Sequence, residues 1–253
     1  MEDESAVGEA HALVRDLRQR CAWDRAQTPQ SLRPYLREEV AELEEALVEG
    51  DEARIASELG DLLLHFLFQV DLAEERGAFT LDDVARTLIA KMKRRHPHLY
   101  GGAEAAPWER QKVAERKAHD RVLGRAPTVL GHLPPTLTEI EKAYRYQERA
   151  AAVGFDWDDL EGPLDKLDEE VHEARRHPVE EIGDVLFAAV NVARKAGVHP
   201  TAALEVATNK FVMRFREVEK LAAERGIAVE TAGLERPKVR QRILTPGAKA
   251  WPG

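Results

Sequence analysis

The sequence has almost no cysteine, no long apolar run and no targeting signal, and each absence narrows what the chain can be. Cys21 is the single cysteine among 253 residues, so an intrachain disulfide and a thiolate metal cluster are both excluded. No stretch of about 18 apolar residues is present to span a bilayer. The acidic, polar N-terminus is unlike a signal peptide. We therefore expect a soluble cytoplasmic protein with no membrane partner.

A basic excess is also missing. The chain has 46 acidic residues against 37 lysines and arginines, and its formal net charge is −9. Nucleic-acid backbones attract basic surfaces, so this balance argues against a nucleic-acid polymer as the main partner. A small phosphate ligand stays possible where a metal ion or a local basic cluster offsets the charge.

Strand signals are absent, and the apolar periodicity is helical nearly throughout. Leu36, Val40, Leu43 and Leu47 follow the i, i+4, i+7 spacing of a helix with one apolar face. Residues 59–73 and 182–193 are apolar on most sides, which is typical of helices buried within a bundle or between subunits. The sequence therefore predicts an all-α fold.

Two halves of the chain repeat the same segments in the same order. Residues 124–136 hold three prolines and two glycines and are the best linker candidate. Matched segments lie on either side: EEVAE with EEVHE, ELGD with EIGD, WD with FD, and AKMKRR with NKFVMR. The repeat predicts two copies of one helical module. We expect a module at 8–123, a linker at 124–136, a second module at 137–230 and a tail at 231–253.

Each half carries two pairs of carboxylates at i, i+3 spacing, which places both members of a pair on one helix face. The pairs are Glu39 with Glu42, Glu58 with Asp61, Glu170 with Glu173, and Glu181 with Asp184. A turn at His177 and Pro178 should make the two second-half helices antiparallel, so that their pairs face each other. Converging carboxylates in a partly dry site cannot all stay ionised without a cation. The alternative is a solvated acidic face.

The ligand types indicate which cation such a site would prefer. An all-oxygen site suits Mg²⁺, or Mn²⁺, better than zinc, copper or iron. A carboxylate-bridged di-iron bundle needs a Glu-x-x-His on each of two helices. Glu169 and His172 form one such pair, but residues 38 and 41 are Glu and Ala, which disfavours di-iron. Lys166 lies one turn before Glu170 on the same face as the acids, so a role in balancing substrate phosphates explains it about as well as an exposed helix charge does.

Taken together, the motifs resemble the MazG family of nucleoside triphosphate pyrophosphohydrolases. The segments that carry the resemblance are CAWDRAQT, EEVAE, ELGD, KMKRRHPHLY, VGFDW, DKLDEEVHE, EEIGDVLFA and NKFVMRFREVE, which together span roughly residues 11–230. The resemblance implies tandem all-α modules, Mg²⁺ dependence, and hydrolysis of a nucleoside triphosphate to its monophosphate and pyrophosphate. It also implies a homodimer in which helices from both subunits complete each bundle.

The resemblance assigns roles to residues of the second half. Glu170, Glu173, Glu181 and Asp184 become the metal ligands and the catalytic set. Lys166, Glu180, Asn209, Lys210 and Arg214 fall where the family holds the substrate or its metals. The C-terminal segment RILTPGAKAWPG contains proline and glycine and looks disordered, and no base-contacting residue can be matched there.

The expected activity is hydrolysis of nucleoside triphosphates with broad base tolerance, which would control nucleotide pools. A narrower pyrophosphohydrolase acting on dUTP or phosphoribosyl-ATP stays open, as does a helical interaction module without catalysis. The halves differ around their acids: where the second has Lys166 and Asn209, the first has Tyr35 and Ala90. We therefore expect the second half to carry turnover and the first to act as a scaffold or regulatory site.

Overall fold

The structure, a computed structural model, describes residues 5–102, 108–226 and 228, and the regular elements in those ranges are α-helices. This confirms the all-α prediction. Internal contacts divide the chain into two units, Met1–Ala105 and Ala106–Gly253. None of the described helices combines the length and apolarity that a bilayer crossing needs. The predicted tail at 231–253 lies outside the described residues.

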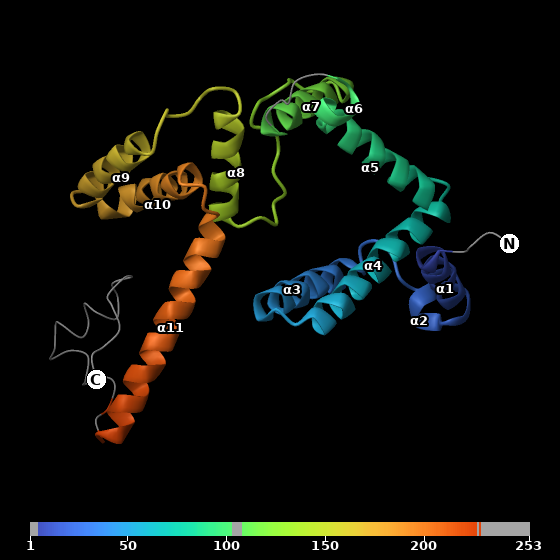
Figure 1. Ribbon diagram of the computed structural model, residues 1–253, viewed down its shortest axis with the longest axis horizontal. Coiled ribbons are helices and arrows are strands. Elements are labelled where there is room, and N and C mark those ends of the chain that lie inside the picture. Colours follow the sequence, from blue (N-terminus) through green and yellow to red (C-terminus); the bar gives the residue numbers. More distant parts are fainter. Residues whose placement is uncertain (1–4, 103–107, 227, 229–253) are drawn as a thin grey trace. The chain divides into compact units, whose positions relative to one another are not determined.

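The described residues of the first unit form six helices, of which α3 and α4 make an antiparallel hairpin (Figure 1). They are α1 Ala6–Arg20, α2 Ala22–Arg25, α3 Arg33–Glu49, α4 Glu52–Glu74, α5 Leu81–Arg95 and α6 Pro97–Tyr100. Gly50 ends α3 with a φ of 72°, in the left-handed region that favours glycine. Asp51 then caps α4 by accepting hydrogen bonds from the N–H groups of Ala53 and Arg54. This short connection returns α4 along α3.

The core of the first unit lies between α1, the start of α3 and α4. Its buried members are Val14, Leu32, Leu67, Phe68 and Leu72. By contrast, α5 has no buried residue, although a capping box between Thr80 and Asp83 defines its start. Leu81 at its start packs against the core, but Leu88 and Ile89 farther along α5 are more than half exposed within this unit.

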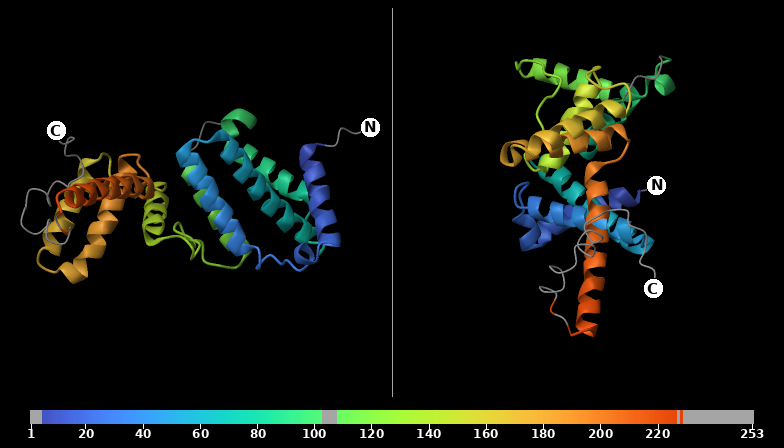
Figure 2. Two further views of the ribbon diagram at one scale, coloured as in Figure 1. Left: turned by 90° about the horizontal axis from the view of Figure 1, so that it is seen from below. Right: turned by 90° about the vertical axis from the view of Figure 1, so that its left-hand side faces the viewer.

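The part of the second unit that the structure describes has five helices, of which α9 and α10 form the corresponding hairpin (Figure 1). They are α7 Trp108–Val122, α8 Glu139–Ala151, α9 Glu161–Ala174, α10 Pro178–Lys195 and α11 Pro200–Glu224. The predicted turn is present, with Pro178 as the first residue of α10. On α8, the Gln147 side chain donates a 2.9 Å hydrogen bond to the Phe187 carbonyl of α10. The right-hand view of Figure 2 shows α11 extending away from this hairpin.

The boundary between the units differs from the expected one. The sequence suggested a first module ending at residue 123, but α7 contacts α8 and is grouped with the second unit. Arg110 on α7 donates to the Ala152 carbonyl at 3.4 Å, and Arg149 on α8 donates to the His132 carbonyl at 3.3 Å. These bonds hold α7 and the proline-containing segment 124–136 against α8.

Candidate metal centres

The α9–α10 hairpin brings three acids of the second unit together. Glu170, Glu181 and Asp184 each offer an oxygen, and the three oxygens lie within 4.8 Å of one another. We call these residues the second-unit cluster. Glu170 is buried, and the ammonium of Lys166 lies 2.7 Å from its carboxylate. Hydrogen bonds to Glu170 and then to Glu169 raise the pKa of Lys166, which secures its positive charge beside the acids.

The α3–α4 hairpin places Glu39, Glu58 and Asp61 in the same way, again with oxygens within 4.8 Å of one another. We call these residues the first-unit cluster. Burial raises the pKa of Glu39, and the charges of Asp61, Glu42 and Glu58 raise it further. A carboxylate shifted in this direction lacks a compensating positive charge. The cluster therefore has the electrostatics of a cation site.

One predicted acid from each set of four stays outside its cluster. Glu173 is half-buried and Glu42 is exposed, and neither contributes to the three converging oxygens. Glu173 lies three residues after Glu170, and Glu42 lies three residues after Glu39. Three residues place a side chain about 60° around the helix axis from the first one. The geometry thus brings together six of the eight predicted ligands, in two groups of three.

A histidine that the sequence reading passed over lies beside the first-unit cluster. His65 is on α4, four residues after Asp61 and so on the same face, and is only 8% exposed. Its Nε2 atom lies 3.9 Å from Glu39 Oε1. Burial lowers the pKa of His65, against a smaller opposite effect from Asp61. The sequence signal was the Asp-x-x-x-His spacing, whereas the second unit has Ala188 at the matching position.

The other predicted substrate residues do not gather at the second-unit cluster in this chain alone. Glu180 is exposed in the first turn of α10, four positions before the cluster member Asp184. Asn209 and Lys210 are exposed on α11, and Arg214 is half-buried there. Among the described residues, neither Asn209 nor Lys210 has a hydrogen bond or ion pair to the acids. In the first unit, Tyr35 replaces Lys166 and packs edge-on against Trp23 with ring centroids 6.0 Å apart.

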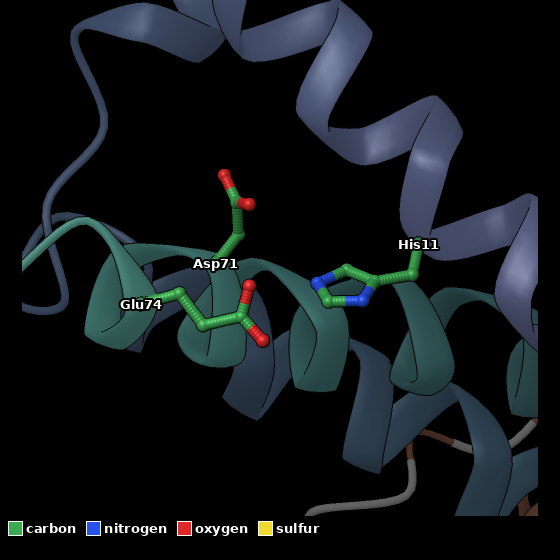
Figure 3. A group of neighbouring side chains, drawn as sticks. All are labelled: His11, Asp71 and Glu74. Atoms are coloured by element: carbon green, nitrogen blue, oxygen red, sulfur yellow. The ribbon is translucent and has the colours of Figure 1, made fainter. Parts of the chain in front are cut away.

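A third group of ligand-type residues joins α1 to α4 and was not predicted. Figure 3 shows the imidazole of His11 reaching toward the carboxylates of Asp71 and Glu74. Arg15 pairs with both carboxylates, and Arg18 Nε lies 3.2 Å from Asp71 Oδ2. Burial alone would raise the pKa of Glu74, but the N–H of Leu81 and the Arg15 guanidinium lower it on balance. Arginines already compensate these acids, so we treat the group as an ion-paired clasp.

Comparison with known proteins adds independent information. Residues 27–100 match the MazG nucleotide pyrophosphohydrolase domain. The chain is 42% identical over 226 residues to the nucleoside triphosphate pyrophosphohydrolase/pyrophosphatase MazG of Thermotoga maritima, covering 85% of this chain and 86% of that protein. It is 37% identical over 239 residues to the nucleoside triphosphate pyrophosphohydrolase of Escherichia coli K12, covering 88% of this chain and 89% of that protein. A nucleoside triphosphate pyrophosphohydrolase of Mycobacterium tuberculosis is 40% identical over 116 residues, which cover 43% of this chain and 36% of that protein.

Proposed function

The chain belongs to the MazG family of nucleoside triphosphate pyrophosphohydrolases, and from this membership we propose that it hydrolyses nucleoside triphosphates to nucleoside monophosphates and pyrophosphate. The observation that carries the proposal is the second-unit cluster with Lys166 beside it. Carboxylates that converge next to a fixed ammonium can hold both a cation and a polyphosphate. No covalent nucleophile is required, because water attacks in a hydrolysis of this kind.

The donor set of the second-unit cluster fits Mg²⁺. Its three ligand atoms are all carboxylate oxygens, and Mg²⁺ prefers oxygen ligands and shares its shell with substrate phosphates. Mn²⁺ has similar preferences. We propose Glu170, Glu181 and Asp184 as ligands, with Glu173 one turn from Glu170 as the fourth. When bound, Mg²⁺ supplies charge neutralisation for the triphosphate and acidifies the attacking water.

Basic and polar side chains would orient the triphosphate. Lys166 is half-exposed, and once Glu170 holds a cation its ammonium can turn to a phosphate oxygen. Lys210 and Arg214 lie one turn apart on α11, with Asn209 next to them. Positive charge held near the developing phosphate charge lowers the barrier. Glu180 precedes Glu181 and is proposed to contact the substrate or a second metal.

We propose that the two units are copies of one module. In each unit a helical hairpin carries the acids, and an earlier helix packs on the second helix of that hairpin. These pairs are α1 on α4 and α8 on α10. The domain match at 27–100 supports the first copy, and the repeated acid geometry supports the second. Turnover is assigned to the second copy because Lys166 faces the acids there while Tyr35 stands at the equivalent first-unit position.

A homodimer would cover the apolar surface that single units leave open. Leu186 and Phe187 on α10 are 61% and 50% exposed, and Phe211 on α11 is also exposed. In the first unit, Leu88 and Ile89 on α5 are more than half exposed. Monomeric proteins rarely expose apolar residues this densely. A second copy of the chain, packing its α10, α11 and α5 against these faces, is the proposed partner.

The cellular role that fits this chemistry is control of nucleotide pools, with the base tolerated broadly. The acidic net charge argues against a nucleic-acid polymer as substrate, whereas a small nucleotide needs only a bound metal ion and local basic groups to offset its charge. The C-terminal residues where base contacts were sought lie outside the described residues, so the proposal names the triphosphate and leaves the base open.

The test is product analysis with a panel of ribo- and deoxyribonucleoside triphosphates in the presence of Mg²⁺. Release of pyrophosphate from several bases supports the proposal, and activity on dUTP or phosphoribosyl-ATP alone indicates a narrower enzyme. Orthophosphate release, or no release, would contradict it. Asp184→Asn should abolish turnover, whereas the matched control Asp168→Asn, an exposed acid on α9 outside the cluster, should retain it.

A further inference from the structure

The first-unit cluster differs from the second in having a nitrogen ligand within reach. His65 lies on α4 one turn after Asp61, and its side chain is 9% exposed. In the second unit the corresponding residue is Ala188, a buried methyl group. The acids alone are alike in the two clusters, so the imidazole is the feature that could give them different metal preferences.

The separation between His65 and Glu39 suits two ligands of one ion. The 3.9 Å between Nε2 and Oε1 is too long for a hydrogen bond. Metal–nitrogen and metal–oxygen bonds of about 2.0–2.2 Å allow two ligands of the same ion to lie up to about 4.3 Å apart. A cation between these atoms would therefore need little movement of either side chain.

The hydrogen bonding of His65 also leaves its burial unexplained. Nδ1 is fully buried and has no hydrogen-bond partner among the described residues. The other ring nitrogen, Nε2, faces Glu39 and is too far from Oε1 to donate a hydrogen bond to it. The imidazole thus presents Nε2 to a carboxylate without bonding to it, and a cation shared by the two groups would complete that contact. Such a cation would not satisfy Nδ1, because one imidazole binds one ion through a single nitrogen.

The nearby positive charge is already committed elsewhere. Arg54 Nε lies 3.8 Å from Glu58 Oε1, but its other guanidinium nitrogens donate to Glu45 and Glu49. Three converging carboxylates thus keep most of their negative charge, which a divalent cation would neutralise. The arginine-paired group around His11 lacks this property, although its histidine is equally buried.

We propose that the first-unit cluster is a mixed imidazole–carboxylate site that selects a transition-metal dication such as Mn²⁺ or Zn²⁺ over Mg²⁺. Imidazole suits these metals, whereas Mg²⁺ favours oxygen ligands alone. The second-unit cluster, with oxygens only, keeps the Mg²⁺ preference. This inference rests on the proposed metal role of Glu39, Glu58 and Asp61 and goes beyond it in naming the fourth ligand and the class of metal.

The experiment uses the full-length chain with Asp184→Asn and Glu181→Gln, which disable the second-unit cluster. Mn²⁺ is the probe, and pulsed electron paramagnetic resonance detects nitrogen bound to it. We expect nitrogen modulation of the Mn²⁺ signal in this double variant. Adding His65→Gln or His65→Leu should abolish the modulation. Adding the control His172→Gln, at an exposed histidine on α9, should leave it unchanged. Unchanged circular dichroism in each variant establishes that the fold is intact.

Binding measurements supply the second readout. His65→Gln should weaken Mn²⁺ binding at the first-unit cluster about 10–100-fold or more, as loss of metal-supporting histidine contacts does, and leave Mg²⁺ binding nearly unchanged. Bound Mn²⁺ without nitrogen modulation, or equal weakening of both metals, would overturn the inference. Failure of the proposed function is a separate outcome, namely absence of pyrophosphate release by the unmodified chain with Mg²⁺.

Discussion

The acid clusters of the two units have matched carboxylates in different surroundings. In the second unit, the ammonium of Lys166 lies 2.7 Å from Glu170. In the first, Tyr35 occupies the equivalent position and packs on Trp23, while His65 approaches Glu39. Carboxylates alone can hold a cation, but a substrate with several negative charges also needs fixed positive groups. The difference supports our proposal that the neighbours of the acids, more than the acids themselves, decide which unit carries turnover.

A second comparison concerns how each unit fastens the end of its hairpin. In the first unit, acids on α4 pair with Arg15 and Arg18 on α1. In the second, the charges are reversed: Arg194 at the end of α10 pairs with Asp156 in the segment after α8. If the two units are copies of one module, as we propose, they keep a clasp near the end of the hairpin while exchanging the sign of each side. The requirement is complementarity of charge.

The largest expected effect among single substitutions next to the clusters is that of Lys166→Met. Loss of one preorganised positive contact to the developing phosphate charge typically lowers kcat by about two to three powers of ten. The matched first-unit variant, Tyr35→Phe, should leave kcat unchanged. Steady-state release of pyrophosphate measures both. If Lys166→Met lost no more activity than Tyr35→Phe, the proposed difference between the units would have no basis in this residue.

A somewhat smaller effect is expected on assembly. Phe187→Asp places a charge on the exposed apolar face of α10, and burying it in a dimer would cost several kcal/mol. The dimer dissociation constant should then rise by two powers of ten or more. Sedimentation at micromolar concentration should show the 28.4 kDa chain in place of a species twice that mass. The control is Val122→Asp on α7, which should still sediment as a dimer; dimeric Phe187→Asp would exclude this face.

The smallest expected effect is on stability and its pH dependence. Burial alone would raise the pKa of Asp156, but Arg194 and Lys195 lower it on balance. Because the folded state lowers this pKa, the ionised Asp156 stabilises the fold fully at neutral pH. This stabilisation is lost as the pH falls from 3.8, the pKa of Asp156 in the unfolded chain, through its lower pKa in the folded state. Asp156→Asn should lower the free energy of unfolding by about 2 kcal/mol at pH 7 and by almost nothing in strong acid.

Denaturant unfolding at a series of pH values measures this contribution. The first-unit counterpart is Arg18→Ala, which removes the partner that lowers the pKa of Glu75 and should have the same sign of pH dependence. A stability loss in Asp156→Asn that was independent of pH would mean that the clasp acts through packing and not through charge.

Much of the fold was predictable because its signals are local. Helix periodicity, the turn at Pro178 and the i, i+3 spacing of the acids together predicted hairpins with facing carboxylates, and Glu170, Glu181 and Asp184 do converge. The position of Glu173 was not predictable, because a rotation of about 60° around α9 decides whether it faces α10. That rotation depends on how the two helices cross.

The remaining features depend on contacts between distant residues. His65 lies in an apolar stretch, where a histidine is as often packed in the core as it is bound to a ligand. Its spacing from Asp61 alone could therefore not identify it as a candidate metal ligand. His11 and Asp71 meet only because α1 packs on α4, sixty positions along the chain. The grouping of α7 with α8 likewise rests on contacts between the two helices, among them the hydrogen bond of Arg110 to the Ala152 carbonyl, that no sequence pattern indicates.

The most direct test of the division of labour is a pair of matched variants, Glu58→Gln and Glu181→Gln, assayed side by side on the same triphosphates with Mg²⁺. The two residues occupy equivalent positions in the two clusters, so each substitution removes the same carboxylate from its own site. The account predicts that Glu181→Gln loses pyrophosphate release almost completely, while Glu58→Gln retains most of it. Equal loss in both variants, or greater loss in Glu58→Gln, would contradict the assignment of turnover to the second unit.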